Sequence, residues 1–263
     1  ALTILRNHKE TKVMPFLCYE SKESSSSLNT TVESALLQND RATFYSFGSF
    51  PKTLDKLRDF GTIVEIKDVQ ELDESQSAAL FIMQKVDPYI VEAIRRKLRF
   101  SKTPVLVVKD KFSKDDAEKL SPFPEVLMVN TSITESEDFI TRVVSLIGGD
   151  ELLPPLTSVL VKRAIAYLNE YATHSVSRWQ IAASVNISED YLTRIFRKEV
   201  GLSPWDYLYR FRIQIASKLL LETGASISEI ASLTGCQDQA YFCRVFRKVK
   251  GFPPGNIRSR SRS

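Results

Sequence analysis

Residues 181–201 read IAASVNISEDYLTRIFRKEVG, and residues 230–251 read IASLTGCQDQAYFCRVFRKVKG. The two stretches are copies of one motif. Their matching positions are Ile181-Ala182 with Ile230-Ala231, and Phe196-Arg197-Lys198 with Phe246-Arg247-Lys248. The offset grows from 49 to 50 residues between these positions, so the second copy has one extra residue in its turn. Two copies are too few for a solenoid, and the repeat therefore predicts a pair of related modules.

Each copy has the pattern of a helix-turn-helix. A short amphipathic helix is expected at 177–185 and again at 226–234. Each runs into a turn with a residue that tolerates positive φ, Asn186 in the first copy and Gly235 in the second. A second helix follows in each copy, and such a helix fits a DNA major groove.

The second helix of each copy has a buried face and a basic, exposed face. Ser188 and Asp238 are expected to cap the two helices. Arg194 and Arg244 hold equivalent exposed positions, where an Arg side chain can pair bidentately with guanine. We expect the DNA contacts to come from Asp190, Thr193, Arg194, Arg197, Lys198, Gln239, Ala240, Arg244, Arg247 and Lys248. Among these, Asp190 either accepts from cytosine or caps its helix.

Residues 203–224, between the copies, predict a connecting helix. Ser203 is its expected cap, and Pro204 suits its first turn. Leu208 and Ile215 belong to an apolar stripe at helical spacing. About 17 helical residues span roughly 25 Å. Such a strut can hold two recognition helices in successive major grooves, which lie about 34 Å apart.

Residues from about Leu156 to Arg258 resemble the DNA-binding domain of the AraC/XylS family of transcription regulators. The matching positions are Ile181-Ala182, Ser188, Tyr191, Leu192, Arg194 and Phe196, then Arg212-Ile213 and Ala216, and then Ile230-Ala231, Gly235, Tyr241, Phe242, Arg244, Phe246, Gly251 and Pro254. Two positions depart from the family pattern, because Cys236 stands where Phe is usual and Asn256-Ile257 where a Tyr commonly precedes Arg258. The resemblance implies binding to double-stranded DNA, with base contacts near Arg194 and Arg244.

The charge of the chain is divided unevenly. Its 263 residues carry a net charge of +4. From Glu151 onward there are 16 Lys and Arg against 9 Asp and Glu, whereas the first 150 residues hold 20 against 23. A basic half beside a mildly acidic half suits a nucleic-acid module joined to a regulatory one. Hydrophobic residues make up 43% of the chain without an 18-residue apolar run, so no membrane span or membrane contact is expected.

Cysteine and histidine usage gives no catalytic or metal pattern. The three cysteines, Cys18, Cys236 and Cys243, lack metal-ligand spacing and fit a reducing cytoplasm. His8 and His174 assemble into no triad, so we expect no catalytic residue, metal or cofactor. The two tryptophans, Trp179 and Trp205, are expected to be core anchors. Because the chain opens at Ala1, we expect it to be a piece of a longer protein.

The first 149 residues predict an α/β domain, a doubly wound parallel sheet. Expected strands are 13–19, 42–46, 62–66, 78–83, 105–108 and 126–129, and expected helices are 30–38, 51–60, 88–98, 114–120 and 135–147. Continuous apolar strands that alternate with helices favour a parallel sheet. Residues 150–155 form the expected linker, 156–258 the all-α DNA-binding domain with its two helix-turn-helix motifs, and 259–263 a basic tail.

The alternating pattern resembles a receiver domain of two-component systems, with 62–66 as an extra run. A working receiver needs acids after its first strand, an acceptor Asp after its third and a Lys after its last. Those regions hold Cys18-Tyr19, Gln84-Lys85 and Asn130-Thr131. Since Mg²⁺ requires carboxylate oxygens, the resemblance implies a degenerate receiver that takes no phosphate. Asp87 is either a displaced acceptor or the N-cap of a helix that begins at Pro88.

Together these patterns predict a non-enzymatic, cytoplasmic, DNA-binding transcription regulator, an activator controlled by its N-terminal domain. Expected partners are double-stranded DNA and RNA polymerase, with a homodimer or an upstream sensor domain as further possibilities. Three alternatives stay open: a phosphorylation-dependent response regulator that uses Asp87, an α/β enzyme fused to a DNA-binding module, and a ligand sensor whose site lies at the carboxyl edge of the sheet.

Overall fold

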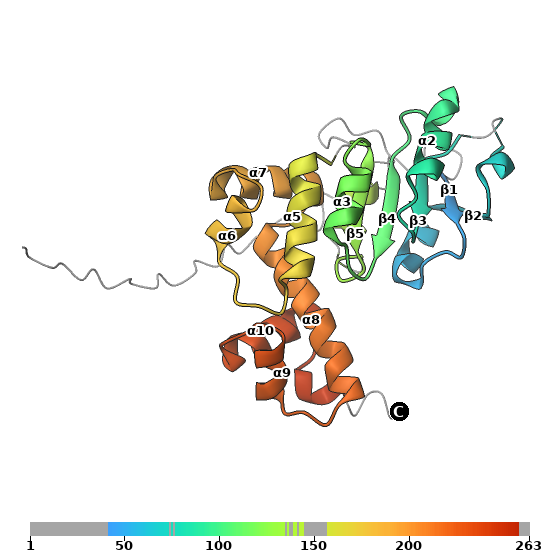
Figure 1. Cartoon of the computed structure of the whole chain (residues 1–263). Coiled ribbons are helices and arrows are strands. Elements are labelled where there is room, and N and C mark those ends of the chain that lie inside the picture. Colours follow the sequence, from blue (N-terminus) through green and yellow to red (C-terminus); the bar gives the residue numbers. More distant parts are fainter. Residues whose placement is uncertain are drawn as a thin grey trace, which may run out of the picture.

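The computed structural model describes residues 42–73, 75, 77–134, 136, 139–140, 142–144 and 157–257. An α/β region precedes residue 145, and a helical region begins at residue 157 (Figure 1). The strand expected at 13–19, the helix expected at 30–38 and the linker at 150–155 lie outside the described residues. Among the helices described, none is long and apolar enough to span a membrane.

The α/β region contains a five-stranded sheet in which every pairing is parallel. The strands are β1 (Ala42–Phe47), β2 (Gly61–Ile66), β3 (Leu80–Met83), β4 (Val105–Lys109) and β5 (Val126–Asn130). Their order, β2-β1-β3-β4-β5, is the flavodoxin-like arrangement of doubly wound folds. The prediction of a parallel sheet is confirmed, but the idea that 62–66 is an extra run is wrong. This run forms β2, which pairs with β1 at the edge of the sheet that the described strands make.

Burial explains why these runs form these strands. Every residue of β3 and β5 is buried, as expected for apolar central strands that are covered on both faces. The helices α2 (Pro88–Arg96) and α3 (Lys114–Leu120) lie in front of the sheet in Figure 1. The helix predicted at 51–60 is present as a 3₁₀ helix, Lys52–Asp59, and it buries Leu54 and Leu57.

The helical region contains two helix-turn-helix units joined by one long helix. Its helices are α5 (Val159–Glu170), α6 (Arg178–Ala183), α7 (Glu189–Val200), α8 (Pro204–Glu222), α9 (Ile227–Leu233), α10 (Gln239–Lys250) and a final 3₁₀ turn (Pro254–Asn256). The first unit is α6 with α7, and the second is α9 with α10. The helix predicted between the units is α8, which starts behind the Ser203 cap and has 19 residues. At about 1.5 Å per residue it is roughly 28 Å long.

The turns and caps of the two units match the predicted ones. Asn186 has φ 57° and Gly235 has φ 75°. A Cβ atom on Gly235 would lie 2.9 Å from the carbonyl oxygen of His174, so only Gly fits there. The Ser188 hydroxyl accepts from the amide of Tyr191, and the Asp238 carboxylate accepts from the amides of Ala240 and Tyr241.

Most of the buried apolar residues that the structure describes fall into two clusters. The first cluster joins the α/β region to the first helix-turn-helix unit, since it includes Phe112 and Leu120 together with Ile165 of α5 and Phe196 of α7. The second cluster belongs to the second unit alone and includes Ile230, Phe242 and Phe246. Helix α8 supplies residues to both clusters: Tyr207, Leu208 and Phe211 to the first, and Ile213, Ala216 and Leu220 to the second.

Candidate nucleic-acid interface

The two second helices, α7 and α10, present the predicted contact residues to solvent. Of the ten, only Thr193 is half-buried, and the other nine are exposed: Asp190, Arg194, Arg197, Lys198, Gln239, Ala240, Arg244, Arg247 and Lys248. The opposite side of each helix enters the core through Leu192 and Phe196, or through Phe242 and Phe246. The division into a buried and a basic face is therefore the one that the sequence predicts.

Each of the two arginines at equivalent positions lies over a tyrosine ring three residues earlier. The Cζ atom of Arg194 lies 5.1 Å from the ring centroid of Tyr191, and that of Arg244 lies 5.6 Å from the centroid of Tyr241. A guanidinium over an aromatic face gains a cation–π attraction and loses rotamer freedom before any DNA is bound. Sequence reasoning used these tyrosines only as family markers, although their shared spacing to the arginines was visible in both copies.

A chain of aromatic rings connects the two units. Arg178 of α6 lies over the ring of Trp205, with 5.9 Å between its Cζ atom and the ring centroid. Trp205 packs edge-on against Tyr209 at 5.4 Å, and Tyr209 against Tyr241 of α10 at 5.1 Å. We call Arg178, Trp205, Tyr209 and Tyr241 the aromatic ladder. Burial is the main cause that raises the pKa of Tyr209 to about 12, with Tyr241 and Cys236 adding to it.

The recognition helices border one surface. A groove of about 310 Å³ is lined by Thr193 and Arg197 of α7, by Trp205 at the start of α8 and by Tyr241 of α10. Side chains from both units thus line the same groove.

The two tryptophans differ in their burial. Half-buried Trp205 lies beside the core as expected. The prediction for Trp179 is wrong, because its side chain is 62% exposed on α6. A short helix with one buried face leaves Trp179 on its outer side.

Arg212 fixes the connecting helix to the loop between α5 and α6. Its side chain is buried, and it donates to the carbonyl oxygens of Ala172 at 2.7 Å and His174 at 2.6 Å. Cys236, the departure from the family pattern, is buried nearby, and burial raises the pKa of its thiol. Arg212 therefore joins α8 to the first half of the helical region, whereas Cys236 belongs to the core of the second unit.

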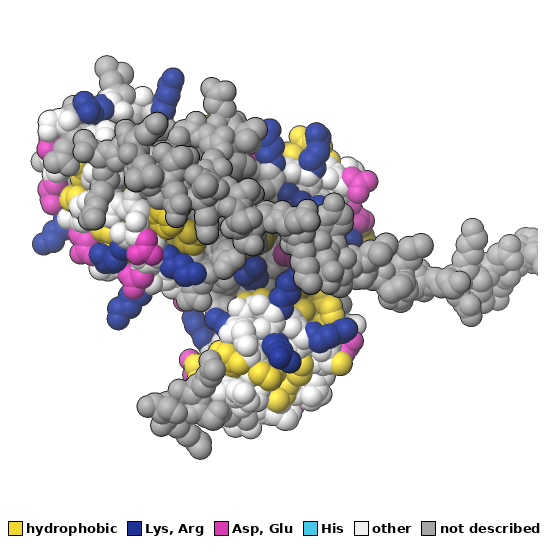
Figure 2. Space-filling model, turned by 180° about the vertical axis from the view of Figure 1, so that it is seen from behind, with side chains coloured by type: hydrophobic (Ala, Val, Ile, Leu, Met, Phe, Trp, Pro, Cys, Tyr) yellow, Lys and Arg dark blue, Asp and Glu magenta, His cyan; other side chains and the backbone are white. Residues whose placement is uncertain are grey.

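The charged residues at the ends of the recognition helices are placed favourably for the helix dipole. Helix α7 has Glu189 and Asp190 in its first turn and Arg197 and Lys198 in its last, and α10 has Arg247, Lys248 and Lys250 in its last turn. In the view of Figure 2, the lower lobe, which contains the second unit, shows more Lys and Arg than Asp and Glu. Such a surface attracts the phosphates of DNA.

The described part of the α/β region carries few groups suited to binding a metal ion or a phosphoryl group. Within the described ranges, no group of three His, Cys, Asp or Glu side chains could hold a metal ion. Strand β1 is followed by Gly48-Ser49 and β3 by Gln84-Lys85. Asp87 is the N-cap of α2, because its Oδ1 accepts from the amides of Tyr89 at 3.0 Å and Ile90 at 3.3 Å. This confirms the capping interpretation of Asp87.

Comparison with known proteins identifies the helical region. The family described as "Helix-turn-helix domain" matches residues 181–260. This part of the chain is a helix-turn-helix DNA-binding domain of the AraC family.

Individual relatives match only part of the chain. The lactose operon transcription activator of Staphylococcus xylosus is 33% identical over 88 residues, which are 34% of this chain and 32% of that protein. The arabinose operon regulatory protein of Salmonella typhimurium is 30% identical over 138 residues, 52% of this chain and 47% of that protein. The chain thus spans less than half of either relative. A solved C-terminal domain of AraT, a response regulator from Geobacillus stearothermophilus, is 32% identical, with 42% of this chain and 88% of that chain covered and a TM-score of 0.37.

Proposed function

We propose that this protein is a transcription regulator, an activator, that inserts α7 and α10 into successive major grooves of double-stranded DNA. The observation that carries the proposal is the matched pair of exposed arginines, Arg194 and Arg244, each held over a tyrosine on helices that border one groove. The name of the lactose operon activator supports the activating role. As an activator in the bacterial cytoplasm, the chain would also contact RNA polymerase.

The base contacts are proposed for the outward side chains near the start of each recognition helix. Arg194 and Arg244 would read guanine, Thr193 a thymine methyl and Gln239 an adenine. The remaining residues, Asp190, Arg197, Lys198, Ala240, Arg247 and Lys248, would complete the interface with backbone and groove contacts. The ladder would hold the two helices at a fixed separation.

The α/β region is proposed to be a degenerate receiver that controls the DNA-binding domain without taking phosphate. Its strand order supports this proposal, because receivers share the flavodoxin-like order. The residues that follow β1 and β3 carry no carboxylate, and Asp87 is engaged as a helix cap. We divide the chain into a control domain at 1–149, a linker at 150–155 and a DNA-binding domain at 156–258, with a basic tail beyond.

Selection from a random duplex library tests the function. The full chain should enrich a site with two half-sites one helical turn apart, about 10 base pairs from centre to centre. The double variant Arg194→Ala and Arg244→Ala should fail to enrich the same site while it keeps the wild-type circular dichroism spectrum. Recovery of unselected sequences by the wild-type chain would contradict the proposal.

A further inference from the structure

The carboxyl edge of the sheet is occupied by the helical region of the same chain. Asp110 follows β4, and Asn130 and Thr131 end and follow β5, so their side chains meet at one edge. In doubly wound folds this edge is where ligands bind. Here the Oδ1 atom of Asn169 in α5 accepts from the Phe112 amide at 2.9 Å and from the Asn130 side chain at 3.2 Å.

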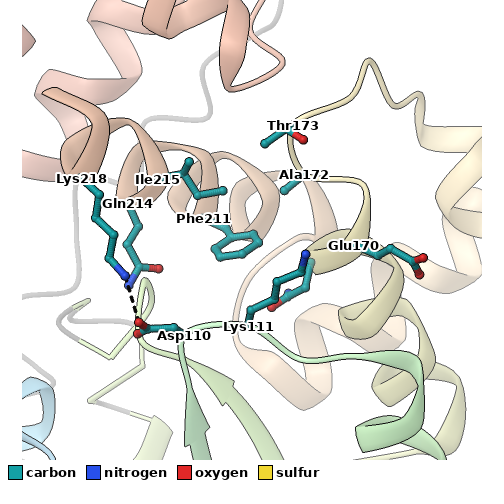
Figure 3. Close-up of a pocket in the computed structure, with 10 residues that line it drawn as sticks. Asp110, Lys111, Glu170, Ala172, Thr173, Phe211, Gln214, Ile215 and Lys218 are labelled. Atoms are coloured by element: carbon teal, nitrogen blue, oxygen red, sulfur yellow. Dashed lines mark hydrogen bonds and ion pairs between the residues drawn. The ribbon is translucent and has the colours of Figure 1, made fainter. Parts of the chain in front are cut away.

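Helix α8 contacts the same edge through two side chains. Gln214 donates to the Thr131 hydroxyl at 2.5 Å, and the Lys218 ammonium lies 2.9 Å from the Asp110 carboxylate, as Figure 3 shows for Lys218 and Asp110. Thr131 in turn donates to Asp110 at 2.6 Å. We call Asp110, Thr131, Gln214 and Lys218 the edge contact. The hydrogen bond from Thr131 and the ammonium of Lys218 hold the pKa of Asp110 below its usual range, so this carboxylate is ionised at neutral pH.

The edge contact lies on the half of α8 that packs against the second helix-turn-helix unit. The first half of α8 belongs to the core that the α/β region shares with the first helix-turn-helix unit. Gln214 and Lys218 lie on the second half, which supplies Ala216 and Leu220 to the core of the second unit. Through these contacts the sheet therefore touches the stretch of helix that carries the second unit.

The edge contact is polar and partly exposed to solvent, which suits a reversible interaction. Asp110, Lys111, Phe211, Gln214 and Lys218 line a cleft of about 200 Å³ between the sheet edge and α8 (Figure 3). The Oε1 atom of Gln214 is buried without a hydrogen-bond partner among the described residues. Asp110 and Lys218 are 62% and 57% exposed, so their ion pair alone contributes little to stability.

We propose that the carboxyl edge of the sheet is an interaction surface for the second half of α8, and that this docked arrangement is the DNA-binding form. The exposure of Arg194 and Arg244 supports this assignment, since both recognition faces are open while the edge contact is made. The position that a working receiver uses for catalysis, at the end of β5, serves here to orient the second recognition helix. This inference rests on the proposed function for its DNA arm only.

A charge exchange across the edge contact tests the proposal. Asp110→Lys and Lys218→Asp each place like charges opposite one another, and the double variant restores an opposite pair at unchanged net charge. Glu170→Lys is the matched control, because Glu170 is an exposed acid that lines the same cleft and points away from α8 in Figure 3. All variants are made in the full chain.

Hydrogen exchange of amides 214–222 reports docking without DNA. Each single variant should exchange about two- to fivefold faster there, and the double variant and Glu170→Lys should match the wild-type chain.

DNA binding tests the second part of the proposal. On the selected duplex, the single variants should bind about two- to fivefold more weakly, and the double variant should regain the wild-type affinity. Unchanged exchange in the single variants, or no recovery in the double variant, would overturn the docking. Tighter DNA binding by both single variants would overturn its assignment to the DNA-binding form. If the wild-type chain binds no duplex, the proposed function is wrong, but the hydrogen-exchange rates still test whether α8 docks on the sheet edge.

Discussion

Tyr209 of the connecting helix packs edge-on against Tyr241 of α10, with 5.1 Å between the ring centroids, and the two side chains share a hydrogen bond. Tyr241 also lies beneath Arg244. Tyr209 therefore influences Arg244, a proposed base-reading residue, through Tyr241, and we regard Tyr209 as a positioning residue. Through Trp205 the same contact reaches the first helix-turn-helix unit.

Replacement of Tyr209 should change both the affinity for DNA and the preferred spacing between the two half-sites. An edge-to-face ring pair contributes about 0.5–1.5 kcal/mol beyond its buried area. Tyr209→Leu should therefore weaken binding to the cognate duplex about two- to tenfold and reduce the preference for one half-site spacing. Tyr209→Phe keeps the ring and should stay close to the wild type in both respects. Titrations on duplexes with one base pair added or removed between the half-sites make this measurement, and equal behaviour of the two variants would contradict the positioning role.

Lys162 of α5 should make the free energy of unfolding increase with pH in the alkaline range. Its side chain is fully buried and donates to the carbonyl oxygens of Leu120 at 2.9 Å and Phe123. Burial lowers the pKa of Lys162 to about 8, against the opposing fields of Glu125 and Glu199. Since an unfolded Lys has a pKa of about 10.4, the unfolded chain binds more protons between these values, and the native state gains stability as pH rises from about 8 to about 10.

Denaturant unfolding between about pH 7 and pH 10.5 measures this slope. The free energy of unfolding of the wild-type chain should rise by about 2–3 kcal/mol relative to that of Lys162→Met, in which the titrating group is absent. The comparison removes the contributions of tyrosines and other lysines, because both proteins share them. Parallel curves for the two proteins would show that Lys162 keeps an ordinary pKa in the native state.

The first domain should not accept a phosphoryl group. The residues after β3 are Gln84-Lys85, and Asp87 is committed to capping α2. Incubation with a small phosphodonor and Mg²⁺ should leave the intact mass unchanged. An acid-labile adduct at one equivalent would contradict the degenerate-receiver proposal, and its loss in Asp87→Asn would locate it.

A fragment from Asp150 to Ser263 should fold and bind DNA with strong salt dependence. The structure adds a condition, because α5 packs against α3 and shares its core. Without the α/β region Lys162 faces water, so the fragment should be less stable than the full chain and should lack the alkaline slope. An unfolded fragment would show that the two regions form one folding unit.

Sequence patterns predicted the elements whose signals are local. The apolar runs of β3 to β5, the capped start of α8 and the paired turns at Asn186 and Gly235 all fall where expected. The place of 62–66 was misjudged, since it was expected as an extra run and is the edge strand β2 of the described sheet. Exposed Trp179 was misplaced because hydrophobicity alone does not say which side of a six-residue helix is covered.

Long-range contacts were beyond sequence reasoning. The partners Asp110 and Lys218 are 108 residues apart, and Thr131 and Gln214 are 83 apart. Nothing in the local pattern distinguishes Lys162 from a solvated lysine on an amphipathic helix, yet it is fully buried. These residues owe their roles to how two regions meet, which requires the fold.

The most direct measurement of the central claim concerns Arg194 and Arg244. Binding of Arg194→Ala and Arg244→Ala should be titrated against the cognate duplex and its single-base variants at several salt concentrations. Each substitution should cost about 1–3 kcal/mol on the cognate duplex and relax the preference at one base position, with each arginine affecting a different half-site. A uniform loss on all duplexes, with the slope of log K against log salt reduced by about one, would mean that both arginines contact only phosphate, and it would contradict the assignment of α7 and α10 as base-reading helices.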